Sequence, residues 1–156
     1  MNDDLWGFSG DEIRTDEPTR GARLKWVVVV DVSLTGGRAA NAVACVAAAT
    51  SPAVSGLLAR GGPDGDGSPH MGLPWAGCSV LAAEGSKLRS LREKAARRAD
   101  VLLVDMPVLA QEARVYDDYL AALRAATGEE IAYAALSLVG PRKSVDRLVG
   151  GLALLP

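Results

Sequence analysis

The hydrophobic and polar positions of this chain fall into blocks that predict strands alternating with helices. Residues 24–30 form a run rich in valine that is apolar except for Lys25, which is typical of a strand covered on both faces. Apolar blocks at residues 75–82, 101–104 and 131–139 predict the other strands. Because strands alternate with helices, we expect one α/β domain over residues 24–156, with a mostly parallel, mixed sheet of about four strands.

The blocks between the strands predict helices. Residues 38–49 consist almost entirely of Ala, Val and Cys, so we expect a helix that is apolar on all sides and therefore buried. Ser86 is the expected N-cap of a second helix, and a third is expected to begin at residues 105–107 and to end at Gly128. The expected buried stripes comprise Leu88, Leu91, Ala95 and Ala99 on the second helix and Leu109, Ala113, Tyr116, Leu120 and Leu123 on the third.

Three segments fall outside this alternation. Residues 1–23 are polar and acidic but contain Trp6 and Phe8, so we expect an arm whose aromatic side chains dock onto the body or onto a partner subunit. Residues 51–74 are rich in Gly and Pro and predict a loop or an irregular hairpin. Residues 137–155 read as a buried strand, a Gly-Pro break, one short helix, a Gly-Gly stop and an apolar ending.

Composition narrows the class of protein. With 156 residues, 49% of them apolar and 23% charged, the chain is long enough for a single globular domain with its own core. The net charge of -2 is too balanced for a protein that coats nucleic acid. Cys45 and Cys78 lie in apolar runs and are expected to be buried, reduced thiols, which favours the cytoplasm. We find no signal peptide pattern, and no apolar run reaches the ~20 residues needed to span a membrane.

The turn between the first strand and the first helix is a candidate ligand site, because ligands of open α/β sheets bind beyond the carboxyl ends of the strands. Gly36 and Gly37 would let an anion or a carbonyl approach the positive end of the helix, with Arg38 and Asn41 beside it. The alternative is a tight turn in which Asn41 satisfies a first-turn N–H. The chain has neither a G-x-G-x-x-G pattern nor a Walker lysine, so a nucleotide is not indicated.

Asp105 has two interpretations that the sequence leaves open. It would cap the third helix, since aspartate is strongly preferred at N-caps. It would equally place a carboxylate at the crevice, where it could act as a base or orient a water molecule. The chain has no G-x-S-x-G pattern and no recognisable nucleophilic cysteine, so a serine or cysteine hydrolase is not indicated.

Other polar residues have both a structural and a functional interpretation. His70 is the only histidine and has no neighbouring set of metal ligands, so we expect no metal and no cofactor; it is a solvated loop residue or a proton shuttle. The second helix is strongly basic and forms a solvated face or contacts phosphates, and Arg142 would add to this basic rim. Its basic residues are Lys87, Arg89, Arg92, Lys94, Arg97 and Arg98.

Both ends of the domain resemble the type II peptidyl-tRNA hydrolases: the first strand and turn with Ala39-Ala40-Asn41, and residues 139–155. Residues 24–155 more fully resemble an uncharacterised bacterial family, the domain of unknown function numbered two thousand. The residues that carry this second resemblance are Gly36, Arg38, Ala39-Ala40-Asn41, His70, Tyr116 and Gly140-Pro141-Arg142-Lys143. The resemblance implies the three-layer α/β/α sandwich of the type II hydrolases, a fold that commonly dimerises.

The hydrolase motifs are incomplete in this chain. Gly36, Gly37 and Arg38 stand where the hydrolases carry turn lysines, and Ala44 stands at the position of their helix histidine. Arginine is a poor general base because it does not readily lose its proton. The resemblance therefore implies the fold rather than the peptidyl-tRNA hydrolase reaction.

These observations predict a cytoplasmic protein with a small crevice at the strand ends. Asp105 is the candidate catalytic residue, and the candidate ligand-binding residues are Gly36, Gly37, Arg38, Asn41, His70, Tyr116 and Arg142. The resemblance favours hydrolysis or transfer of an acyl or peptidyl group on a small or tRNA-linked substrate. The alternative is a non-catalytic module that binds a small ligand, tRNA or protein. We expect a homodimer, because symmetric dimers are the commonest assemblies, and no association with a membrane.

Overall fold

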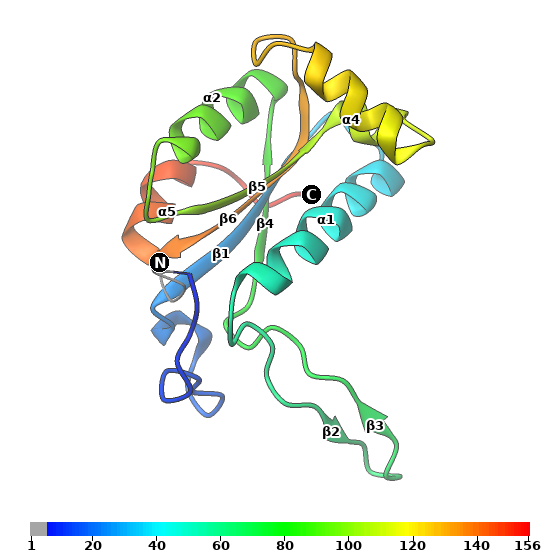
Figure 1. The fold of residues 1–156 in the computed structure, drawn as a ribbon. Helices are drawn as coiled ribbons and strands as arrows, with labels where there is room; N and C mark the ends of the chain where they lie inside the picture. Colours follow the sequence, from blue (N-terminus) through cyan, green and yellow to red (C-terminus); the bar gives the residue numbers. More distant parts are fainter. Residues whose placement is uncertain (1–5) are drawn as a thin grey trace.

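The computed structural model describes residues 6–156, which form an α/β domain around a four-stranded mixed sheet (Figure 1). The strands are β1 (Leu24–Asp31), β4 (Ser79–Ala83), β5 (Leu102–Pro107) and β6 (Tyr133–Pro141), in the order β4-β1-β6-β5. The expected mixed sheet of about four strands is confirmed, but the expectation that it is mostly parallel is wrong. Only β1 and β4 pair in parallel, because β6 lies between β1 and β5 and runs antiparallel to both.

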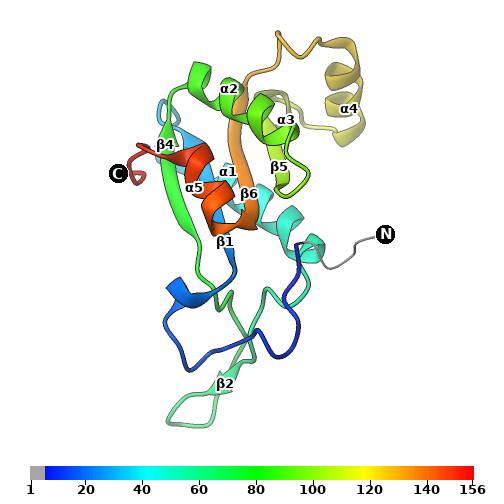
Figure 2. The same cartoon turned by 90° about the vertical axis from the view of Figure 1, so that its left-hand side faces the viewer.

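Helices cover both faces of this sheet. The helix α1 (Gly36–Thr50) packs against one face. The helices α2 (Gly85–Ala96) and α5 (Arg142–Val149) pack against the other, where Figure 2 shows them side by side. The crevice described below lies at the β5 edge of the sheet, next to α1.

The strand β1 connects the two halves of the core, because successive side chains of a strand point to opposite faces. Val28 and Val30 belong to the cluster that includes α1, whereas Val27 and Val29 belong to the cluster that includes α2 and α5. All four valines are 0% exposed, and burying one such side chain stabilises a fold by roughly 1.5–3 kcal/mol. The prediction of a strand covered on both faces is confirmed.

A small polar network ties α1 to the middle of the sheet. The indole N–H of Trp26 donates a hydrogen bond of 2.8 Å to Oγ of Ser137, which lies 2.7 Å from Oγ1 of Thr50. The Thr50 hydroxyl also lies 2.7 Å from the carbonyl oxygen of Val46, one turn earlier in α1. Buried polar groups are tolerated when they are hydrogen-bonded to one another, so this network fixes the C-terminal end of α1 against β1 and β6.

The C-terminal segment covers one edge of the sheet. After α5, Gly151 adopts a φ of +82°, a conformation that glycine takes without strain. The chain then runs beside β4: the N–H of Ala82 donates to the oxygen of Ala153, and the N–H of Leu155 donates to the oxygen of Val80. The predicted order of strand, break, helix, Gly-Gly stop and apolar ending is confirmed.

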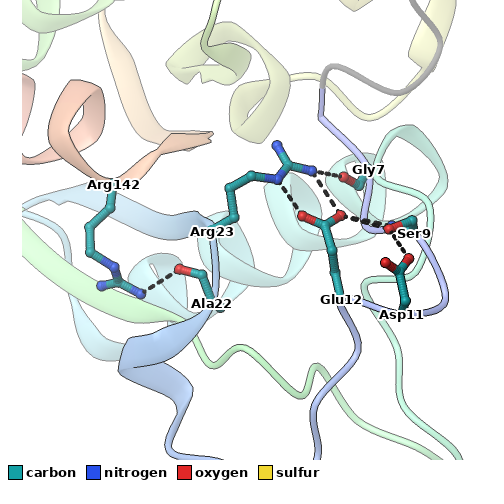
Figure 3. A network of polar contacts seen from close by, with 7 residues as sticks. All are labelled: Gly7, Ser9, Asp11, Glu12, Ala22, Arg23 and Arg142. Carbon is teal, nitrogen blue, oxygen red and sulfur yellow. Dashed lines mark hydrogen bonds and ion pairs between the residues drawn. The ribbon is translucent and has the colours of Figure 1, made fainter.

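The N-terminal arm folds back onto the body. Phe8 is 6% exposed, and its ring lies 4.8 Å from that of Trp75 in an edge-to-face contact. Figure 3 shows the clamp that holds the arm: Nε of Arg23 donates to Glu12 over 2.5 Å, and its Nη2 donates to the oxygen of Gly7 over 2.7 Å. The expectation that the arm docks is confirmed, and the surface that receives it belongs to the same chain.

A hairpin projects from the body between α1 and β4 (Figure 1). It contains the two-residue strands β2 (Gly62–Pro63) and β3 (Pro69–His70), which confirms the irregular hairpin predicted for this segment. A short 3-10 helix, Ser51–Ala53, leads into it, and another, Thr19–Gly21, precedes β1. Three large apolar side chains of the hairpin are exposed: Leu58, Met71 and Leu73.

The predicted third helix is wrong at its start and in its continuity. The strand β5 continues through Pro107, which an edge strand tolerates because the missing N–H is not needed for pairing. Asp105 therefore lies inside a strand and caps no helix. The helical region consists of α3 (Val108–Glu112) and α4 (Tyr116–Ala125), separated where Ala113 adopts an extended conformation with a ψ of 139°.

Two details of the second helix also differ from the prediction. Ser86 lies inside α2, whose N-cap is Glu84. Ala99 lies beyond the end of the helix and is exposed, whereas Leu88, Leu91 and Ala95 are buried as predicted.

The expectation that the first helix is buried on all sides is wrong. Only one side of α1 faces the sheet, because no other element covers the helix from outside within residues 6–156. The exposed residues on its outer side include Ala40, Ala44, Cys45, Ala48 and Ala49. The expectation of buried thiols is wrong as well, since Cys45 and Cys78 are both exposed.

Candidate functional site

A cavity of about 430 Å³ lies beside the β5 edge of the sheet, and we call it the β5 crevice. Its floor is the second half of β5, one wall is α1, and the other wall is formed by α3, α4 and the segment between them. The lining residues are Cys45, Val46, Ala49, Val104, Asp105, Met106, Pro107, Ala110, Ala113, Arg114, Val115, Tyr116 and Tyr119. Most of these are apolar, and Asp105 is the only carboxylate among them.

Asp105 is held in place by an arginine of α2. Nε of Arg92 donates a hydrogen bond of 3.0 Å to Oδ2 of Asp105, whose side chain is 23% exposed. The guanidinium carbon of Arg92 lies 5.7 Å from the centroid of the Tyr133 ring, a distance that permits a cation–π contact. Within residues 6–156 the other carboxylate oxygen of Asp105 has no hydrogen-bond donor.

Two tyrosines of α4 add hydroxyl groups to the crevice. The rings of Tyr116 and Tyr119 lie 5.5 Å apart in an edge-to-face arrangement, one turn apart on the helix. Tyr116 is 72% exposed. Burial and then the negative charge of Asp105 raise the pKa of Tyr119, so this hydroxyl keeps its proton at neutral pH and remains a hydrogen-bond donor.

The structure brings together two of the predicted site residues, Asp105 and Tyr116, in the β5 crevice. The predicted site at the start of α1 lies beside this crevice and not in its lining. There Gln111 of α3 connects two predicted residues: it accepts a hydrogen bond from Nε of Arg38 and donates to the Arg38 carbonyl and to Oδ1 of Asn41. Gly36 and Gly37 are exposed in the first turn of the same helix.

The structure places the remaining predicted residues elsewhere. His70 lies on the projecting hairpin, with Nε2 3.3 Å from Oδ2 of Asp64, and both side chains are exposed. Arg142, the first residue of α5, donates to the carbonyl oxygens of Thr19 and Ala22 over 3.3 Å each, and Figure 3 shows the contact with Ala22. Arg142 therefore fixes the segment before β1 and does not reach the β5 crevice.

Sequence reasoning missed three contributors to this region. The sequence marks Arg92 only as part of a basic helix, because its contact with Asp105 depends on the packing of α2 on the sheet. Tyr119 had a local signal, because it follows Tyr116 by three residues and so shares a helix face with it. The pattern of hydrophobic and polar positions gives no indication that Gln111 contributes to this region.

The basic residues predicted for the second helix do not form one continuous surface. Arg89 and Arg92 line a pocket beside Tyr133, whereas Arg98 donates to Asp100 and to Ser144. The other basic side chains, Lys87, Lys94 and Arg97, are exposed. The interpretation of this helix as a phosphate-contacting face stays a prediction.

Within residues 6–156, no group of three or more His, Cys, Asp or Glu residues is arranged to hold a metal ion. No helix there combines the length and apolar content that crossing a membrane requires.

The fold and the crevice define an α/β protein with a mixed four-stranded sheet and an apolar cavity at one sheet edge. The chain belongs to the DUF2000 family, described as a protein of unknown function, which matches residues 24–156. This confirms the resemblance to that family seen in the sequence.

Comparison with solved structures gives a similar result. The chain resembles the protein of unknown function Atu0240 from Agrobacterium tumefaciens strain C58, with a TM-score of 0.78 and 16% sequence identity, over 85% of this chain and 97% of that one. At this identity the likeness shows the fold alone. No curated protein sequence matches the chain significantly.

Proposed function

We propose that the β5 crevice binds an acyl or peptidyl ligand and that Asp105 acts there as a general base in its hydrolysis or transfer. The observation that supports this proposal most is that Asp105, whose carboxylate is held by Arg92, is the one acidic residue lining a largely apolar cavity. The cavity volume of about 430 Å³ lies in the usual range for small-molecule pockets, roughly 300–1,000 Å³. Apolar walls suit an acyl or side-chain carbon skeleton, and the carboxylate supplies the polar group that acts on it.

The proposed reaction is the addition of water to an ester or amide carbonyl. The free oxygen of Asp105 accepts a proton while the water oxygen bonds to the carbonyl carbon. The hydroxyl of Tyr119 donates a hydrogen bond to the carbonyl oxygen as negative charge develops there. The proton then passes from Asp105 to the leaving oxygen or nitrogen as its bond to carbon breaks. Arg92 is a positioning residue, because it holds the other oxygen of Asp105.

A panel of p-nitrophenyl esters of N-acyl amino acids tests this proposal through release of p-nitrophenol. We expect Asp105→Asn to lower kcat/KM by about 10²-fold or more, the usual contribution of a general base. Asp118→Asn, an exposed aspartate of α4 that does not line the crevice, is the control and should leave kcat/KM unchanged.

Calorimetry with the corresponding N-acyl amides separates binding from catalysis. If the wild type binds the amides but does not hydrolyse the esters, the protein is a non-catalytic binding module and not an enzyme. An Asp105→Asn variant that hydrolyses the esters at the wild-type rate would remove Asp105 from the reaction.

We further propose that the family shares the three-layer α/β/α fold of the type II peptidyl-tRNA hydrolases and that this protein is a cytoplasmic homodimer. Helices on both faces of the sheet support the first point. The exposed Leu58, Met71 and Leu73 of the hairpin support the second, since large apolar side chains left in water are candidates for burial at an interface. Light scattering should show a dimer for the wild type and a monomer for Met71→Glu/Leu73→Glu. A wild-type monomer at high concentration would refute the dimer.

A further inference from the structure

A second pocket, of about 400 Å³, lies outside the β5 crevice on the α2 side of the Arg92–Asp105 pair. We call it the α2 pocket. It is formed by one side of α2, the start of β6 and the loop that precedes β6. Its lining residues are Arg89, Arg92, Glu93, Thr127, Gly128, Glu129 and Tyr133.

The two arginines of the α2 pocket differ in how they are bound. Arg92 is engaged, since it donates to Asp105 and lies over the ring of Tyr133. Nε of Arg89, three residues earlier on the same helix, is buried and has no hydrogen-bond partner among residues 6–156. A buried donor without an acceptor is unfavourable, so the pocket offers one guanidinium that lacks an anionic partner.

The carboxylates of the pocket restrict which anion fits. Glu93 and Glu129 line the same space, and neither has an ion-pair partner within 4 Å among the residues the structure describes. Since Asp105 offsets the charge of Arg92, the remaining charges of the pocket lining are those of Arg89, Glu93 and Glu129. A phosphate dianion would be repelled by both carboxylates, whereas a ligand that carries a carboxylate and an ammonium group would complement all three side chains.

Tyr133 also lines the α2 pocket. Burial raises the pKa of its phenol, so the hydroxyl keeps its proton at neutral pH and is available as a hydrogen-bond donor.

We propose that the α2 pocket binds a zwitterionic amino acid. Arg89 takes its carboxylate, and Glu93 and Glu129 take its ammonium group. The proposal is independent of the function proposed for the β5 crevice, because none of these three residues lines that crevice.

The Nε–Hε signal of Arg89 reports on this site directly in a proton–nitrogen NMR spectrum. We would titrate the full-length protein with glycine, and separately with acetate, methylammonium and inorganic phosphate, at constant ionic strength. The proposal expects a saturable shift of the Arg89 signal with glycine, and at least a tenfold weaker response to each of the other three. Arg89→Met should abolish glycine binding, and Glu93→Gln/Glu129→Gln should weaken it at least tenfold.

Arg97→Met is the matched control, because Arg97 is an exposed arginine beyond the end of α2 and does not line the pocket; it should bind glycine as wild type does. Arg89→Lys keeps the charge and covers the case in which Arg89→Met fails to fold. Three results would overturn the proposal. They are a shift of the Arg89 signal that stays linear with glycine concentration, tighter binding of phosphate or acetate than of glycine, and an equal loss of glycine binding in Arg97→Met. Failure of this proposal is distinguishable from failure of the proposed function, because glycine binding is followed by the Arg89 signal and ester hydrolysis by release of p-nitrophenol.

Discussion

Arg92 of α2 donates a hydrogen bond of 3.0 Å to Asp105 of β5, and the two residues belong to different pockets. Asp105 lines the β5 crevice, whereas Arg92 lines the α2 pocket. A ligand that moves either side chain therefore acts on the neighbouring pocket through a single hydrogen-bonded pair. This relationship makes Arg92 and Asp105 the first residues to vary.

A double-mutant cycle with Arg92→Met and Asp105→Asn measures the energy of this pair. The two side chains are 38% and 23% exposed, so solvent screens their attraction and we expect a coupling of at most about 1 kcal/mol in urea unfolding. Arg92→Met should nevertheless lower ester hydrolysis, because the carboxylate loses its orientation. A coupling of several kcal/mol would show that the pair is a structural element of the core.

Ser137→Ala should destabilise the fold by about 1–3 kcal/mol, because the buried Trp26 N–H loses its acceptor. The Thr50 hydroxyl should be affected less, since it retains the oxygen of Val46. Ser79→Ala, which changes an exposed serine on β4, is the control and should lie within about 0.5 kcal/mol of wild type. Urea unfolding followed by circular dichroism tests both values, and equal stability of the two variants would contradict the role of the network.

Acid should release the N-terminal arm before the domain unfolds. Hydrogen bonds from Arg23 lower the pKa of Glu12 from 4.5 to about 2. A carboxyl group whose folded pKa is lowered stabilises the docked arm fully above pH 4.5, and this contribution is lost as the pH falls from 4.5 towards 2.

Hydrogen exchange of the Phe8 amide reports on docking, because this N–H donates to the oxygen of Ser55. We expect its protection to fall over that pH range in wild type. Glu12→Gln should show weaker protection at pH 7 and no such decline. Protection that is independent of pH in wild type would show that the clamp does not hold the arm.

The two cysteines should differ in reactivity at pH 7.5. Both residues are exposed, but desolvation of the Cys78 sulfur raises the pKa of that thiol to about 11, so little reactive thiolate is present. We expect N-ethylmaleimide to react faster with Cys45, measured in the Cys78→Ser variant, than with Cys78, measured in the Cys45→Ser variant. Modified Cys45 should also block ligands from the β5 crevice, which it lines; binding that survives complete modification would place the ligand elsewhere.

The central strand and the C-terminal region could be predicted from the sequence for a local reason. Every position of residues 27–30 is buried, so the valine run itself identifies a strand covered on both faces. Gly140-Pro141 and Gly150-Gly151 mark the limits of α5 through backbone constraints that act within a few residues.

The third helix shows where local patterns are insufficient. The segment from Asp105 to Pro107 resembles a helix start, because aspartate and proline are both favoured there. Pairing with β6 instead extends β5 through Pro107, and this pairing connects residues about 30 positions apart in the sequence. Because of the same pairing, Asp105 occupies a strand position instead of a helix cap, and from that position it contacts Arg92.

The sequence by itself determined the α/β class, the strand covered on both faces, the docked arm with Phe8, and the choice of Asp105 and Tyr116 as candidates. Only the tertiary structure decided that these two share a cavity, that Arg92 holds the carboxylate, and that Arg38 and Asn41 lie beside the cavity with Gln111. The physical reason is that burial and backbone propensity are properties of neighbouring residues, whereas a site forms from side chains that meet only when α1, α2 and α4 pack around the edge of one sheet.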